Sequence, residues 1–113
     1  MPRRVPPADQ AIRWVEEWCQ TPAGGPVRLS DGEIAVIRRF YESGDPAPAG
    51  RLAAFLILIA LAGPSEAHPP ESEIATDVFS LWAAAGPELR VHLRRVGNTV
   101  SCPALGRRWS TAA

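Results

Sequence analysis

Apolar residues recur at helical spacing in the first part of the chain. Ile12, Val15 and Cys19 form a stripe along the segment that starts at Asp9, while charged residues take the opposite side. Asp9 can serve as an N-cap, because its carboxylate can accept a hydrogen bond from a free backbone N–H. The pattern predicts a first helix from about Asp9 to Trp18, followed by a loop rich in proline and glycine.

The next segment carries the clearest helix signature in the sequence. Ser30 and Glu33 have the spacing of a capping box, in which each side chain binds a free backbone N–H at the start of the helix. Ile37 and Tyr41 continue one apolar face, with arginines and a glutamate on the other. Gly44 is placed to end the element. A second helix is therefore predicted between Ser30 and Gly44.

Residues 51–62 are apolar on all sides, which is typical of a helix at the centre of a core. The apolar run from Leu52 to Ala62 has 11 residues. As a helix it would be about 16 Å long, roughly half the hydrocarbon thickness of a bilayer. We therefore expect a buried helix and no membrane partner. The chain also opens without the apolar run of a signal peptide, which favours a cytoplasmic location.

Two further helices are predicted in the last third of the chain. An apolar stripe runs over about residues 71–85, made by Ile74, Val78, Leu81, Trp82 and Ala85. Gly86 and Pro87 break this fourth helix, and Pro87 suits the first position of a fifth one. The apolar positions Leu89, Leu93 and Val96 then continue at helical spacing.

The same residues allow a second interpretation of this region. Val91–Val96 and Thr99–Cys102 contain β-branched residues and flank the turn-forming pair Gly97–Asn98, so they can also pair as a β-hairpin. The predicted fold class is all-α: a compact bundle of about five short helices, with a small C-terminal hairpin as the alternative. The whole chain, residues 1–113, is expected to form one domain.

The charges are balanced overall and unevenly distributed. All 12 basic residues are arginine, and they equal the 12 acidic residues. Residues 86–113 form a basic C-terminal segment with five arginines and one acid, a net charge of +4, whereas residues 51–85 have one arginine and four acids, a net charge of −3. Arginine binds phosphate and carboxylate through two parallel hydrogen bonds. The candidate binding residues are Arg90, Arg94, Arg95, Arg107, Arg108 and the adjacent Trp109.

Explanations without a binding role also fit the arginines and Trp109 of this segment. Arginines on a solvated helix face bind nothing in many proteins, and Trp109 can either stack on a base or fold back as a plug over the helices. A polyanion contact and head-to-tail self-association both fit the uneven charge.

Several kinds of chemistry are excluded. A chain without lysine has neither the usual P-loop nor a Schiff-base lysine. His68 and His92 do not form an HExxH motif, and Cys19 and Cys102 are too far apart in sequence to suggest a zinc-ligand pair. No nucleophile and base are paired in the local sequence. We therefore expect a protein that is not an enzyme and that holds no metal or cofactor.

One segment carries a family resemblance. The run Ile-Arg-Trp-Val-Glu-Glu-Trp-Cys from Ile12, with the following Pro22, Gly25, Pro26 and Leu29, resembles the opening segment of tailed-phage terminase large subunits. In that family a second helix ends in an Ile-Tyr or Phe-Tyr pair, and Phe40–Tyr41 falls where that pair would be. The likeness covers residues 10–43. Gly32–Glu33 replaces the aromatic–glutamine pair of the family, and the ATPase motor does not follow, so no motor activity is implied.

The leading hypothesis is a non-enzymatic interaction module of a phage, prophage or other mobile element. The resemblance implies a protein that works beside a DNA-packaging motor. The basic segment predicts that its partner is DNA, or a phage packaging or capsid protein. The alternative is a structural adaptor or homo-oligomer without nucleic-acid binding, in which the acidic middle of one copy meets the basic end of another.

Overall fold

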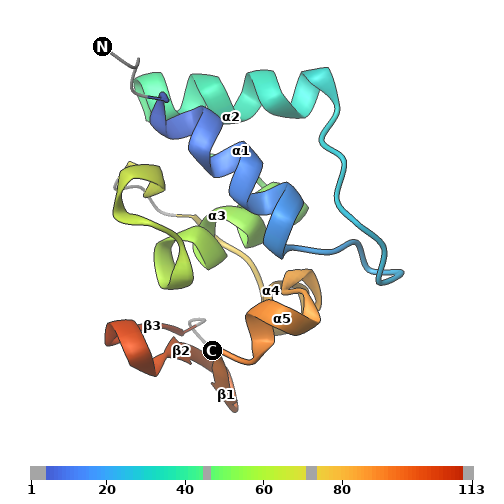
Figure 1. Cartoon of the computed structure of the whole chain (residues 1–113), viewed down its shortest axis with the longest axis vertical. Coiled ribbons are helices and arrows are strands. Elements are labelled where there is room, and N and C mark those ends of the chain that lie inside the picture. The colour runs from blue at the N-terminus through green and yellow to red at the C-terminus, as the bar shows by residue number, and fades with distance from the viewer. Residues whose placement is uncertain (1–4, 45–46, 71–73, 111–113) are drawn as a thin grey trace.

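Helices and a small antiparallel sheet share one hydrophobic core (Figure 1). This computed structural model describes residues 5–44, 47–70 and 74–110. The helices are α1 (Pro7–Trp18), α2 (Asp31–Ser43), α3 (Arg51–Ala62), α4 (Val78–Ala84) and α5 (Pro87–Arg90), with single 3₁₀ turns at η1 (Ser65–Ala67) and η2 (Pro103–Leu105). The strands are β1 (Arg94–Val96), β2 (Thr99–Cys102) and β3 (Arg107–Ser110), and they pair in the order β1-β2-β3.

The first helix begins slightly earlier than predicted. Pro7 occupies its first position and Pro6 its N-cap, so Asp9 lies in the first turn and does not cap the helix. A proline fits here because its missing N–H would have no partner in the helix. The carboxylate of Asp9 instead pairs with Arg38 of α2, with an Oδ1–Nη2 distance of 3.0 Å. This ion pair links α1 to α2.

The capping box of α2 is confirmed. The backbone N–H of Glu33 donates to Ser30 Oγ at 3.1 Å, and that of Ser30 donates to Glu33 Oε1 at 3.0 Å. Gly44 ends the helix with φ +74°, a left-handed conformation that favours glycine. The Glu33 carboxylate also accepts from the Arg51 guanidinium of α3 at 2.6 and 2.8 Å. This guanidinium contributes most to lowering the pKa of Glu33 to about 2.

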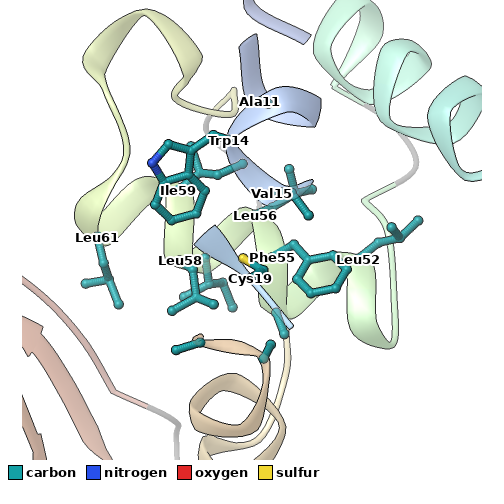
Figure 2. Packing of buried hydrophobic residues seen from close by; sticks show 14 of the residues in the cluster. Ala11, Trp14, Val15, Cys19, Leu52, Phe55, Leu56, Leu58, Ile59 and Leu61 are labelled. Atoms are coloured by element: carbon teal, nitrogen blue, oxygen red, sulfur yellow. The ribbon is translucent and has the colours of Figure 1, made fainter. Parts of the chain in front are cut away.

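Helix α3 is the centre of the core, as its sequence predicted. Its side chains from Leu52 to Ile59 are all buried, and α1, α4 and two of the strands pack against it. Figure 2 shows Trp14 and Val15 of α1 lying over the side chains of α3. Among the described residues, no helix has both the length and the apolar character needed to cross a membrane.

The all-α prediction is wrong, since the C-terminal part forms a three-stranded antiparallel sheet. The predicted fifth helix stops at Arg90 after four residues. The hairpin alternative is confirmed over a shorter length, with Arg94–Val96 pairing with Thr99–Cys102. Gly97 makes the turn possible because it has φ +58°, as the first position of a type II′ turn requires. The third strand, Arg107–Ser110, was not predicted.

The fourth helix is also shorter than predicted. Residues 74–77 are not helical, and 71–73 lie outside the described residues. Asp77 is the N-cap of α4, because its Oδ1 accepts from the backbone N–H of Ser80 at 2.7 Å. Ile74 therefore lies before the helix, in a segment without regular secondary structure, and its side chain packs against the core. The residues of the predicted apolar stripe do pack in the core, but only the second half of the predicted segment is a helix.

The end of α1 is joined to the turn between α4 and α5, although these segments lie far apart in the sequence. Cys19 and Ala85 form an isolated antiparallel bridge. The backbone N–H of Gln20 donates to the carbonyl of Ala84 at 2.8 Å, and that of Gly86 donates to the carbonyl of Trp18 at 3.0 Å. These bonds fix the C-terminal sheet relative to the N-terminal helices.

Candidate anion-binding surface

The five C-terminal arginines do not form one surface. The ion pairs between described residues join Arg38 to Asp9 and Arg51 to Glu33, so neither involves the C-terminal segment. The positive charge predicted there is therefore not neutralised by the described carboxylates of the chain. The individual arginines nevertheless have three different environments.

Arg107 caps the C-terminal end of α3. Its Nη1 donates to the carbonyls of Gly63 at 3.3 Å and Ala60 at 3.5 Å. These carbonyls lie at the end of the helix, where a cation also interacts favourably with the helix dipole. Arg107 is half-buried in this position. Its role is therefore structural, and we remove it from the candidate binding residues.

His68 completes this arrangement as an acceptor. Arg107 Nη1 lies 2.8 Å from His68 Nε2. Because a guanidinium can only donate, Nε2 must be unprotonated and the imidazole neutral. Burial, and secondly the charge of Arg107, lower the pKa of His68 below its ordinary value. Protonation of His68 would place two cations in contact and break the bond.

This contact predicts a pH-dependent stability. Below about pH 6.5 the unfolded chain takes up a proton on His68 that the folded protein resists, so stability falls as the pH falls towards the lowered pKa. We expect the melting temperature of the native protein to drop more between pH 7 and pH 5 than that of His68→Asn, which keeps an acceptor but cannot titrate. Circular dichroism melts at both pH values measure this. His92 is present in both proteins, so an equal drop in the two would refute the assignment to His68.

Arg90 is held against α4. Its Nε donates to the carbonyl of Trp82 at 3.3 Å, and its guanidinium carbon lies 5.6 Å from the centre of the Trp82 ring. Both contacts hold the arginine near the C-terminal end of α4, where a cation is favourable. Arg90 is thus half-buried, and part of its guanidinium is already used in contacts with Trp82.

Arg95 stacks on an exposed aromatic ring. Its guanidinium carbon lies 4.8 Å from the centre of the Phe79 ring on α4, and 70% of Phe79 is exposed. Two further apolar side chains of the same region are open to solvent, Val91 at 81% and Val96 at 62%. The sequence analysis missed this aromatic residue. The signal was available, because Phe79 lies off the apolar stripe of its own helix.

Arg94 and Arg108 lie on the outer face of the sheet. Arg94 is opposite Ser101, and Ser101 is opposite Arg108, so these residues form one row across the three strands. Side chains in such a row point to the same side. The opposite side faces the core, because Val100 and Cys102 of β2 are buried. Both arginines are exposed, and neither side chain makes an ion pair or hydrogen bond with another described residue.

Trp109 belongs to the inner face. It pairs with Val100 across the β2–β3 ladder and packs against the core, so it is only half-exposed. This position favours the interpretation as a plug over a role in base stacking. Of the six candidate residues, Arg94 and Arg108 therefore remain fully available. Arg95 lies on the same side of the sheet as Val100 and Trp109, opposite to Arg94.

No catalytic constellation is evident around the cysteines. Cys19 is buried, and burial raises the pKa of its thiol, so it is protonated and a poor nucleophile. Within the described ranges, no group of three His, Cys, Asp or Glu side chains could hold a metal ion. The chain matches no protein-family model, and comparisons with curated proteins and with solved structures give no match either.

Proposed function

We propose that this protein is a non-enzymatic module that binds DNA through the outer face of its sheet. The contacts come from the row Arg94–Ser101–Arg108. The observation that carries the proposal is this row, which presents two unpaired guanidinium groups and a hydroxyl on one side of the sheet.

The spacing of the row suits a phosphate backbone. Two strand-to-strand distances separate the backbones of Arg94 and Arg108, about 10 Å in all. This corresponds to roughly three base steps of 3.4 Å along one strand of DNA. The two guanidinium groups can therefore bind separate phosphates. Arg95 belongs to the other side of the sheet, in the row Arg95–Val100–Trp109, so its contact with Phe79 lies outside this surface.

The likeness of residues 10–43 to terminase segments supports DNA packaging in a phage or prophage as the setting. In that setting the module works in the cytoplasm beside a packaging motor, and a packaging or capsid protein can contact its other faces. Loss of the basic row would then weaken the contact with DNA but leave the helices that contact the partner unchanged.

A salt titration tests DNA binding. We expect fluorescence anisotropy with a labelled 20-nucleotide DNA, single-stranded and duplex, to show affinity falling steeply as salt rises. Arg94→Gln/Arg108→Gln should reduce the slope of log K against log salt by about 2, since each phosphate contact contributes about 0.9. Arg13→Gln/Arg28→Gln is the matched control, because it removes the same charge from exposed positions outside the C-terminal segment. Absence of binding at low salt, or equal losses in the two double variants, would reject the proposal.

The exposed apolar side chains favour a second candidate. The exposed side chains of Phe79, Val91 and Val96, and the free edge of strand β1, can contact another protein or another copy of the chain, as an adaptor or homo-oligomer requires. Sedimentation measurements separate the candidates. An assembly that dissociates on raising the salt, together with no DNA binding, would favour the adaptor.

A further inference from the structure

A small aromatic pocket lies on the protein away from the arginine row. It is formed where the end of α1, the end of α3, α5 and the η2 turn meet, and it has a volume of about 300 Å³. Trp14 and Trp18 come from α1, Leu89 from α5, and Leu105 from η2. His92 follows α5, and Cys102 ends β2. The proposed DNA contact uses none of these residues.

The walls of the pocket are aromatic and apolar. The rings of Trp18 and His92 meet edge to face, with centroids 6.4 Å apart and an angle of 73° between planes. Leu89 and Cys102 are each only 2% exposed and form buried wall. No Arg, Asp or Glu lines the pocket, so it offers nothing to balance the charge of an ion.

The rim of the pocket is apolar as well. Leu105 is 48% exposed and lines the pocket. Neither tryptophan donates a hydrogen bond from its indole N–H to another described residue, and neither N–H is sealed from solvent. Buried tryptophans usually find a partner for this group. The site therefore combines apolar walls with unused donors.

The volume sets the size of an occupant. A dry cavity of about 150 Å³ is enough to bind benzene. Twice that volume accommodates a fused two-ring molecule, and it lies at the lower end of the range for small-molecule sites, about 300–1,000 Å³. Flat rings also suit the edge-to-face geometry that Trp18 and His92 already present.

We propose that this pocket binds a small, neutral, flat aromatic molecule of about two fused rings. The ligand lies between the tryptophans and Leu105, with its edge towards the His92 ring. Its binding is independent of the anion-binding row.

Titration followed by ¹H–¹⁵N NMR tests the pocket, with indole, quinoline and 2-naphthol as neutral probes. We expect saturable shifts at Trp18, His92 and Leu105 for at least one probe, with a Kd of about 0.1–1 mM for so small a ligand. Indole-3-carboxylate is the charged match of indole and should bind at least about tenfold more weakly, because no arginine lines the site.

Two variants localise the binding. Leu105→Ala should weaken the probe that binds best by about fivefold, since it removes part of the apolar rim. Val91→Ala truncates another exposed apolar residue, one that does not line the pocket, and should leave binding unchanged. Absence of saturable shifts for all three probes would overturn the proposal. Shifts of the same residues on concentrating the protein alone would overturn it too, by assigning the pocket to a side chain of a second copy.

Discussion

Replacing Phe55 by alanine is expected to lower the free energy of unfolding by about 3–5 kcal/mol. Phe55 lies in α3 and is 1% exposed, so the change leaves a large cavity where the helix meets the rest of the core (Figure 2). The surrounding elements cannot collapse into this space without moving the central helix. Urea unfolding followed by circular dichroism measures the loss, and the slope of the transition should stay constant if only stability changes.

Phe79→Ala is the matched control for this experiment. It removes the same ring from a side chain that is 70% exposed, and should cost no more than about 0.5–1 kcal/mol, including its stacking with Arg95. Similar losses for the two variants would mean that α3 is not the centre of the core. That result would contradict the packing on which the fold rests.

Replacing Gly86 by alanine is expected to cost about 3 kcal/mol, despite adding only one methyl group. A Cβ at this position would lie 2.6 Å from the carbonyl oxygen of Trp18, which is a backbone atom and cannot rotate away. Relief of the clash has to separate the chain segments and weaken the bond from the Gly86 N–H to that carbonyl, 3.0 Å long in the native protein. Overpacking and the lost bond contribute about 1–3 and about 1 kcal/mol respectively. Thermal and urea unfolding measure the effect.

Gly32→Ala makes the same chemical change where there is room. The added Cβ would meet only Ser30 Oγ at 3.9 Å, an ordinary contact. Because alanine is a better helix former than glycine, this variant should be neutral or about 0.5 kcal/mol more stable. If both glycine variants behaved alike, the close approach of Gly86 to α1 would be refuted.

Where local signals agree, the sequence was enough to predict the structure. The predicted capping box of Ser30 and Glu33 begins α2, and Gly44 ends it. Helix α3 is apolar on all sides, so in a small domain it has to lie in the core. In α2 the contacts of the capping box lie within one helical turn of each other. The prediction therefore needed no knowledge of the rest of the fold.

The C-terminal part failed for the opposite reason. Leu89, Leu93 and Val96 have helical spacing, yet Val96 lies in a three-residue strand, too short for the alternating pattern of strands to be recognised. Strand β3 depends on pairing with β2, where Trp109 lies opposite Val100. Such pairing is a property of two segments together, and neither segment alone indicates it.

The candidate site was predicted only in outline. Charge counting found the basic segment, but it could not separate Arg107, which binds His68 and the end of α3, from Arg108, its neighbour on the opposite face of β3. The alternation of side chains along a strand makes this difference, and no strand was predicted in this segment. Phe79 was not singled out, although its place off the apolar stripe of its own helix predicts an exposed ring.

The bridge between Cys19 and Ala85 has a consequence for the evolution of the chain. The N-terminal helices are not a detachable module, since α1 ends on hydrogen bonds to Ala84 and Gly86, far away in the sequence. If a protease cuts the chain between α2 and α3, the two fragments should therefore stay associated or unfold together. Transfer of the N-terminal helices to another gene would require the recipient protein to supply matching hydrogen-bond partners for the end of α1.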